Sequence, residues 1–326
     1  MQTRREFGKM AAAVLTSSAL FARAGWAAGK LDSTVKGVKL GVIAPSFNPP
    51  RPPAGSTLPP QKPLTVDEVI ADYIAVGAAN VEYGGPAEGM PRLIDGVIGQ
   101  PPPTLTEAYT KSRKEVREWH MSAPLGQFHE ARKKFDAAGL NWFSGVNTIA
   151  ADCDDEEIDA IFKQMDAMGV KIFCTNQTRV DTAARMIAPA KKYGIKPAFH
   201  THDKSDDANE VASADSLERL LKMSPMFMIN LDIGHYTAGN QDAVAFIKRH
   251  HDRITHLHVK DRKKNHGPNM AWGEGDTPIK ECLRLIRDNH FPIYAIVERE
   301  YHGSNDGTAV EETKKDLDYM RAALLS

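Results

Sequence analysis

The sequence predicts an α/β protein of the (β/α)8 class, a TIM barrel formed as a single domain. Eight short apolar segments with strand character alternate with amphipathic helical segments along the 326 residues. The last four of these strands end in histidine or acidic residues, which is where barrels of this class place their active sites. An open doubly wound sheet is the alternative, but no glycine-rich phosphate loop follows the first strand.

The composition is that of an ordinary globular protein, with 42% apolar and 25% charged residues. No run of 18 apolar residues occurs, so we expect no membrane span. The three cysteines, Cys153, Cys174 and Cys282, are an odd number without close spacing. They indicate neither a disulfide framework nor a CxxC zinc site, and Cys174 is expected to be a small core residue.

The first residues predict an export signal. Two arginines precede Phe7, a modestly apolar run extends over residues 10–22, and small residues suited to cleavage follow up to Ala27. The pattern resembles a twin-arginine signal peptide over residues 1–27, with the barrel over 28–326 and a periplasmic location. The alternative is a disordered basic N-terminus.

The charge of the exported chain disfavours nucleic acid as a partner. Residues 1–24 carry a net charge of +3, so their removal takes the chain from −1 to about −4. A phosphorylated substrate is also disfavoured, since no phosphate cradle is evident. The oligomeric state is left open, with a homo-oligomer as one possibility.

Two long insertions follow the first and second strands. The first strand is expected at 38–44, and residues 45–63 after it contain eight prolines, which excludes a helix or a central strand. The second strand is expected at 79–85, and residues 86–125 form the next excursion, with a charged helix at 111–120. Both insertions would lie on the catalytic face and roof the site.

The remaining elements alternate regularly. A helix is expected from Thr65 to about Gly77, with Thr65 as its N-cap. Proline at position 197 is a mild objection to the fifth strand, because it removes a ladder donor. Further strands are expected at 140–146, 170–175, 195–200, 227–232, 254–259 and 293–298, and further helices at 128–138, 154–168, 181–193, 214–223, 242–251, 278–289 and 310–325.

The candidate metal ligands stand at the ends of strands five to eight. They are His200, Asp232, His258 and Glu298. Neighbouring strands of a closed barrel would bring them together, and two imidazoles with two carboxylates suit Mn²⁺, Fe²⁺, Co²⁺ or Zn²⁺ better than Ca²⁺ or Mg²⁺. Taken singly, each has a structural alternative: a strand-end histidine is often only hydrogen-bonded, and Glu298 can pair with Arg299 or Lys260.

Four motifs resemble those of the xylose-isomerase-like, sugar phosphate isomerase/epimerase superfamily of TIM barrels. They are Leu-Asp-Ile-Gly-His at 231–235, His-Leu-His-Val-Lys-Asp at 256–261, Trp-Gly-Glu-Gly-Asp at 272–276 and Val-Glu-Arg-Glu at 297–300. The resemblance implies one divalent metal ion, Mn²⁺ first, with Zn²⁺, Co²⁺ or Fe²⁺ as alternatives. By position, Asp232, His258 and Glu298 match ligands of that superfamily.

The fifth strand departs from the pattern. The superfamily usually has a glutamate there, and this chain has His200. Typical epimerases of the group use two glutamates, one on each face of the sugar carbon, so this departure puts two-glutamate epimerisation in doubt. Histidine can still bind a metal or act as a base.

The chemistry expected from such a site proceeds through a metal-stabilised enediolate. Glu298 and His200 are the candidate bases, and Lys260, His235 and His202 would stabilise the oxyanion or move protons. Returning the proton to the other face epimerises the carbon, and losing a β-substituent is elimination. We therefore expect a sugar or keto-sugar isomerase, epimerase or lyase.

Several further residues are candidates for substrate contact. Besides His202, they are Glu274 in the Trp-Gly-Glu-Gly loop and the aromatic side chains of Trp272 and Tyr236, with Phe47 and Trp142 as less favoured stacking partners. The alternatives are a simple glycine turn for the loop and ordinary packing for each ring. His256 is left unassigned, either behind the ligands or as barrel filling.

Two rival functions follow from the same residues. A non-catalytic periplasmic sugar-binding barrel is the first, and His200 in place of a glutamate is its main support. An endonuclease-IV-like enzyme is the second, but it would need a cluster of several metals and a phosphate-binding surface. A small carbohydrate is therefore the expected partner.

Overall fold

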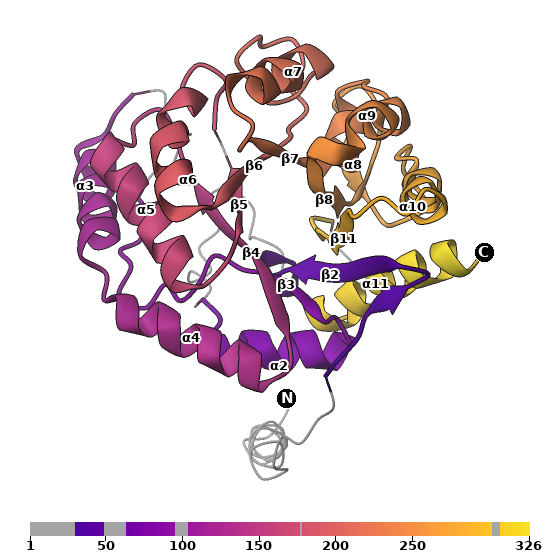
Figure 1. Ribbon diagram of the computed structural model, residues 1–326, viewed down its shortest axis with the longest axis horizontal. Helices are drawn as coiled ribbons and strands as arrows, with labels where there is room; N and C mark the ends of the chain where they lie inside the picture. The colour runs from indigo at the N-terminus through magenta and orange to yellow at the C-terminus, as the bar shows by residue number, and fades with distance from the viewer. Residues whose placement is uncertain (1–29, 49–62, 95–103, 177, 302–306) are drawn as a thin grey trace, which may run out of the picture. The chain divides into compact units, whose positions relative to one another are not determined.

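The computed structural model describes residues 30–48, 63–94, 104–176, 178–301 and 307–326, and contains a closed eight-stranded parallel barrel (Figure 1). The sheet closes because β2 pairs in parallel with both β11 and β3. A short strand, β1 (Thr34–Val35), pairs antiparallel with β2 outside the ring. The barrel strands are β2 (Val38–Ile43), β3 (Asn80–Glu82), β4 (Asn141–Thr148), β5 (Ile172–Asn176), β6 (Lys196–His200), β7 (Met228–Asp232), β8 (Ile254–Val259) and β11 (Tyr294–Val297).

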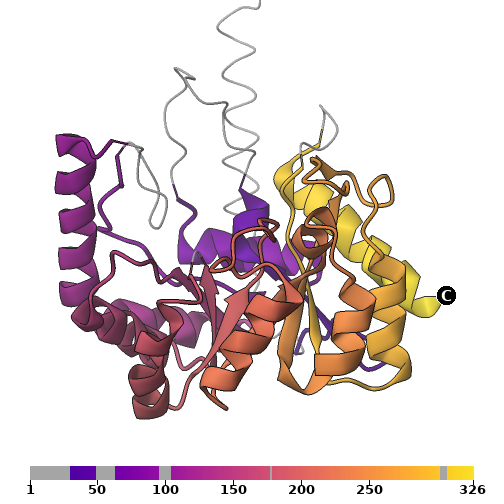
Figure 2. The ribbon, with the colours of Figure 1, turned by 90° about the horizontal axis from the view of Figure 1, so that it is seen from above.

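Helices surround the strands in the usual order of a (β/α)8 fold (Figure 1), and Figure 2 shows the same helices and strands after a turn of 90°. They are α2 (Val66–Val76), α3 (Glu107–Ser122), α4 (Leu125–Ala137), α5 (Asp155–Ala167), α6 (Ile187–Tyr193), α7 (Ala214–Met223), α8 (Ile233–Ala238), α9 (Ala243–His250), α10 (Ile279–Asp288) and α11 (Ala309–Leu325). Among the described residues, no helix is long and apolar enough to cross a membrane.

Local sequence signals explain where the helices begin and end. The Thr65 side chain accepts the backbone N–H of Glu68, and the Glu68 carboxylate accepts that of Thr65, which is a complete capping box at α2. Gly77 and Gly194 end α2 and α6 in the left-handed conformation that glycine adopts without strain.

The barrel has an apolar layer inside it, separate from the larger core under the helices. Ile43, Phe143 and Ile296 form this inner cluster, and the Phe143 ring stacks on that of Tyr294 with 4.3 Å between centroids. His256 meets Phe143 edge to face at 5.5 Å. His256 therefore lies between this apolar cluster and His258, whose ring is 5.3 Å from its own.

The expected elements are present, with boundaries shifted by a few residues. Pro197 lies within β6, opposite Phe173, so it does not interrupt the strand. The helix expected at 181–193 begins as a 3-10 turn (Ala183–Met186) before α6, and α3 is longer than expected and packs outside α5 (Figure 1). The one-and-a-half-turn helix α8 was not predicted.

Several predictions fall on residues that are not described. The export signal at 1–27 lies wholly outside the described residues, as do residues 49–62 and 95–103 of the two insertions. The export signal and the covering of the site by the two insertions therefore stay predictions. The three cysteines are free and buried, in agreement with the absence of a disulfide framework among them.

Candidate metal centre

The four predicted ligands come together at the carboxyl ends of β6, β7, β8 and β11. His200, Asp232, His258 and Glu298 each offer one ligand atom, and these atoms lie within 4.8 Å of one another. The register explains the convergence, because Asp232 is paired directly with His258 across β7 and β8. The first three side chains are buried, and the Glu298 side chain is 15% exposed.

His200 presents a lone pair to this cluster. Its Nδ1 lies 2.7 Å from the Asn230 side-chain oxygen, an acceptor, so Nδ1 carries the hydrogen. The other nitrogen, Nε2, then faces the Asp232 carboxylate at 4.0 Å. Burial lowers the pKa of His200 well below its ordinary value, which keeps the ring neutral and able to ligate.

Asp232 is held by the start of α8. Its Oδ1 accepts the backbone N–H of His235 at 2.7 Å as the helix N-cap, and this fixes the direction of the carboxylate. The other oxygen, Oδ2, makes no hydrogen bond of good geometry among the described residues, and neither does His258 Nδ1. Asp232 Oδ2 instead faces the Lys260 ammonium at 3.0 Å, and His258 Nδ1 faces Glu298 Oε2 at 3.2 Å. A buried cluster that attracts positive charge in this way fits a cation.

Lys260 lies among the same carboxylates. Its ammonium is 3.0 Å from Asp232 Oδ2, 3.0 Å from Glu298 Oε2 and 2.6 Å from Glu300 Oε2, and the side chain is 2% exposed. Glu300 was not among the predicted site residues, although the Glu-Arg-Glu motif contains it. The lysine therefore supplies positive charge in the place where a metal ion would also bring it.

The charges of the cluster depend on one another. Burial raises the pKa of Asp232 well above its ordinary value, despite Lys260. Burial acts the same way on Glu298, but Lys260 and His258 outweigh it and hold the pKa of Glu298 well below its ordinary value. Glu298 is therefore ionised at neutral pH, which a metal ligand or a general base requires.

Glu82, at the end of β3, is a site residue that the sequence analysis missed. Its side chain is fully buried, and Oε2 lies 3.1 Å from Nε2 of both His256 and His258. Together with Cys174 these residues form a second group of possible ligand atoms, which shares His258 with the first. The available signal was its place at a strand end, the same signal that identified Asp232.

A second set of polar side chains lies beside the metal cluster. His235 Nδ1 is 2.6 Å from an Arg262 Nη1 that can only donate, so Nδ1 accepts and Nε2 carries the hydrogen. Burial, and then Lys260, lower the pKa of His235, and the ring is neutral. Its centroid is 5.8 Å from that of His200 and 5.5 Å from that of His202.

His202, a predicted substrate contact, is held at both nitrogens. Nδ1 lies 2.8 Å from a Glu210 carboxylate oxygen, and Nε2 lies 3.1 Å from the Asn176 side-chain oxygen. The structure places its ring next to His200, at 5.2 Å between centroids. His202 therefore borders the cluster.

The structure places Tyr236, a predicted substrate contact, in the hydrophobic core. Tyr236 lies on α8, is 1% exposed and packs against Phe246 of α9 in the hydrophobic core. The sequence analysis had no α8, so it treated Tyr236 as part of an open loop. Phe47 and Trp142 also lie in this core, as the packing alternative expected.

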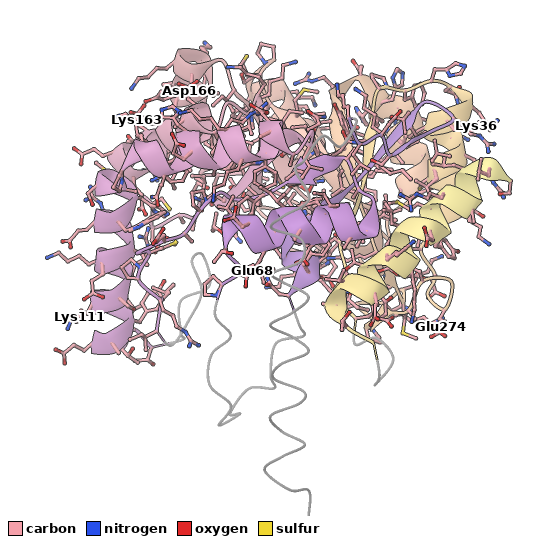
Figure 3. All side chains as sticks on the ribbon, turned by 90° about the horizontal axis from the view of Figure 1, so that it is seen from below. Lys36, Glu68, Lys111, Lys163, Asp166 and Glu274 are labelled. Carbon is pink, nitrogen blue, oxygen red and sulfur yellow. The ribbon has the colours of Figure 1, made fainter. Side chains whose placement is uncertain are left out.

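The Trp-Gly-Glu-Gly loop is folded around Asp261. The Asp261 carboxylate accepts backbone N–H groups of Gly273, Gly275 and Thr277 at 2.8–3.2 Å. A β-carbon on Gly275 would lie 1.9 Å from Asp261 Oδ1, so this position needs glycine. Trp272 packs edge to face on Tyr319, and Glu274 is exposed at the surface near α11 (Figure 3).

A sequence model of one family matches this chain. The family is described as "Xylose isomerase-like TIM barrel", and the match spans residues 174–323. It covers the half of the barrel that carries the predicted ligands. The resemblance expected from the motifs is thereby supported for this part of the chain.

Curated relatives match the chain at low identity. Inosose dehydratase of Mesomycoplasma hyopneumoniae is 26% identical over 155 residues, 41% of this chain and 50% of the relative. Inosose dehydratase of Clostridium perfringens is 23% identical over 143 residues, 38% of this chain and 47% of the relative. The chain thus spans about half the length of the curated relatives it matches.

Solved structures share the fold over most of the chain. D-psicose 3-epimerase from Clostridium cellulolyticum, in complex with D-tagatose, superposes with a TM-score of 0.60 at 11% identity, covering 88% of this chain and 99% of that one. The zinc-bound IOLI protein gives a TM-score of 0.59 at 13% identity, covering 89% and 98%. At such identities the likeness establishes the barrel only.

Proposed function

We propose that this protein is an enzyme that depends on one divalent metal ion and removes a proton beside the carbonyl group of a sugar or keto-sugar. The observation that carries the proposal is the convergence of His200, Asp232, His258 and Glu298 at the carboxyl ends of adjacent strands. The ion would polarise the carbonyl and stabilise the negative charge of an enediolate.

The donor set suits such an ion. Two imidazoles and two carboxylates are ligands that Mn²⁺, Zn²⁺, Co²⁺ and Fe²⁺ accept. His200 offers a neutral nitrogen, and Asp232 Oδ2, which makes no hydrogen bond of good geometry among the described residues, lies in the same cluster. Mn²⁺ remains our first expectation, and a zinc-bound structure of the same fold makes Zn²⁺ the first alternative.

The proton transfers belong to the side chains around the cluster. Glu298 is kept ionised by Lys260 and is the candidate base. Neutral His235 carries its hydrogen on Nε2 and can donate it in a hydrogen bond to a substrate oxygen, as an oxyanion stabiliser does. Lys260 can return a proton, since its ammonium contacts both Glu298 and Glu300.

The reaction class is an isomerisation, an epimerisation or an elimination. His200 stands where a two-glutamate epimerase has its second glutamate, and burial lowers the pKa of its imidazole, which makes it a weaker base than an ordinary histidine. The curated relatives are named dehydratases, which gives support to elimination. We keep both outcomes because they share the same first proton removal.

Exchange of substrate hydrogen with solvent tests the proposal. Protein loaded with Mn²⁺ is incubated with a panel of keto-sugars in D2O, and deuterium uptake at the carbon beside the carbonyl is followed by NMR. We expect uptake with the wild type and its loss both after chelation and in Glu298→Gln. Uptake that persists after full metal removal would contradict the proposed role of the metal.

A metal-free sugar-binding barrel is the second candidate, and Lys260 is the observation in its favour. The lysine ammonium already neutralises Asp232 and Glu298 at 3.0 Å, so the cluster can exist without an ion. This candidate predicts sugar binding that is insensitive to chelation, with no deuterium uptake. The same panel of keto-sugars separates the two candidates.

A further inference from the structure

Glu82 is a carboxylate buried inside the barrel, with contacts that point toward the metal cluster. Its side chain is 0% exposed, and it comes from β3, on the opposite part of the ring from β7 and β8. A buried carboxylate is costly unless it is paired, and its partners here are His256 and His258. Glu82 belongs neither to the four sequence motifs nor to the four candidate metal ligands, so its burial has no explanation yet.

The contact with His258 is a hydrogen bond. His258 Nε2 and Glu82 Oε2 are 3.1 Å apart with hydrogen-bond geometry, whereas His256 Nε2 has the same distance without that geometry. A carboxylate can only accept, so the hydrogen on this side of the His258 ring is on Nε2. Glu82 thereby fixes which nitrogen carries the hydrogen.

The other nitrogen of His258 faces the candidate metal centre. Nδ1 lies 3.2 Å from Glu298 Oε2 and has no hydrogen bond of good geometry among the described residues. The His258 ring thus lies between the Glu82 carboxylate at Nε2 and the candidate ligand Glu298 at Nδ1. In metalloproteins, a carboxylate behind a ligating histidine orients the ring and makes its free nitrogen more basic.

We propose that Glu82 is a positioning residue for His258, which holds Nδ1 toward the metal cluster and strengthens it as a ligand. This inference rests on the proposed metal-dependent function and adds to it a residue distant in sequence. Glu82 acts through the ring and does not touch the ion.

The alternative is that Glu82 binds an ion of its own with Cys174, His256 and His258. The hydrogen bonds disfavour it, because His258 Nε2 is already bonded to Glu82 and the Cys174 thiol donates to the Asn230 side-chain oxygen at 3.5 Å. Burial also raises the pKa of Cys174 well above its ordinary value, so this thiol would have to give up a firmly held proton to bind zinc as a thiolate.

The test is the affinity for a metal ion alone, with Co²⁺ and Zn²⁺ as probes. Metal-free wild type, Glu82→Gln and Glu157→Gln are titrated in competition with a chromophoric chelator, and the visible spectrum of bound Co²⁺ is recorded. Glu157 is the matched control, since it is also 0% exposed and also pairs with a histidine, His120, but lies away from the cluster.

The expected result is an affinity about 10–100-fold weaker in Glu82→Gln, with an altered Co²⁺ spectrum. Glu157→Gln should keep the wild-type affinity and spectrum even if it unfolds at a lower temperature. Equal affinity and equal spectra in wild type and Glu82→Gln would overturn the positioning role. So would two ions per wild-type chain with one lost in Glu82→Gln, because Glu82 would then be a ligand.

A second variant is needed in case the protein does not fold without the Glu82 carboxylate. Glu82→Asp keeps the charge but shortens the side chain, and its affinity should fall between those of wild type and Glu82→Gln, or below wild type if Glu82→Gln does not fold. Wild-type affinity in Glu82→Asp together with misfolding of Glu82→Gln would assign Glu82 a purely structural role. A wild type that binds neither ion would overturn the proposed function itself, and this inference with it.

Discussion

Lys260 supplies a positive charge in the middle of the acidic side chains of the site. The chain puts Asp232, Glu298 and Glu300 around one ammonium, all within 3.0 Å of it. Buried carboxylates without a partner are strongly unfavourable, so the lysine stabilises the cluster in the absence of an ion. A metal ion bound here would therefore compete with the lysine for Asp232 Oδ2 and Glu298 Oε2.

Replacing Lys260 by methionine should destabilise the metal-free protein by about 3–5 kcal/mol, because it removes a buried ammonium that lies 3.0 Å from both Asp232 and Glu298. Added Mn²⁺ or Zn²⁺ should then raise the unfolding temperature more than in the wild type. Chemical and thermal unfolding with and without metal measures both effects.

Lys314→Met is the control for Lys260→Met, since Lys314 pairs with Asp318 at 2.7 Å on the surface of α11 and the two side chains are 50% and 49% exposed. Little change in stability and no change in the metal effect are expected there. A metal-free Lys260→Met as stable as wild type would show that the lysine is not the internal counter-charge.

His258 predicts how metal binding depends on pH. Burial opposes its charge, but Glu82 and Glu298 outweigh burial and raise the pKa of His258 to about 10 in the metal-free protein. An ion must displace that proton, so the apparent affinity should rise as pH rises toward 10, by up to about tenfold per unit. Chelator competition between pH 6 and 9 tests this, and a flat profile would contradict the assignment of His258 as a ligand.

Sequence reasoning at the residue scale found the candidate ligands and missed the residues that support them. Asp232, His258 and Glu298 could be chosen because each ends a strand within a recognisable motif. Glu82 also ends a strand but lies in no such motif, and its bond to His258 joins residues 176 positions apart and depends on how the barrel closes. The position of Tyr236 in the core could not be predicted without the short helix α8.

At the scale of elements, α8 connects the fold to the site. It begins at Asp232, whose side chain caps it, and it passes so close to Lys260 that only glycine fits at position 234. A β-carbon there would lie 2.6 Å from Lys260 Cγ and 2.7 Å from the Lys260 carbonyl oxygen. The close approach of α8 to β8 therefore fixes the positions of Asp232 and Lys260 relative to each other.

Gly234→Ala should therefore push α8 and β8 apart. We expect a loss of about 1–3 kcal/mol in the free energy of unfolding, as overpacking typically causes, together with weaker metal binding. The control is Gly126→Ala in α4, where a new β-carbon meets no atom within 4 Å among the described residues. Equal stability of the two variants would show that α8 tolerates displacement.

The alternation of strands and helices could be predicted well, because long periodic segments carry their own signal. Helix α7 and strand β8 have the boundaries expected from the sequence. Helix α8 has six residues, too few to show a helical period, and its sequence follows a strand without a loop. Only the capping contact of Asp232 reveals it.

At the scale of the whole molecule, α11 docks on the barrel through buried polar groups near the site. Asp316 of α11 accepts a hydrogen bond of 2.9 Å from the Tyr301 hydroxyl. Tyr301 lies in the chain segment after β11, two residues beyond Arg299. Burial raises the pKa of Asp316 to about 8, so in the folded protein it stays protonated far above the pH at which it ionises when unfolded.

The folded state therefore binds a proton at Asp316 that the unfolded chain has lost between about pH 4 and 8. This group makes the wild type less stable as pH rises through that window. Asp316→Asn lacks the effect, so its stability relative to wild type should grow with pH. Unfolding at several pH values measures the difference, and a constant difference would refute it.

The count of eight strands predicts the closed barrel, but it does not predict which side chains meet in the barrel interior. The inner stack of Phe143 on Tyr294 and the polar path from His256 to Glu298 arise from strands that meet only when the ring closes. Strand periodicity indicates which residues alternate, but not which layer of the barrel each one occupies.

The most direct test of the account is the metal content of protein purified without a metal-binding tag, with Asp232→Ala and His258→Ala beside it. We predict one Mn, Zn, Co or Fe per wild-type chain by elemental analysis, and its loss in both folded variants. A folded wild type without metal, even after reconstitution, would contradict the metal-dependent function and favour the sugar-binding barrel.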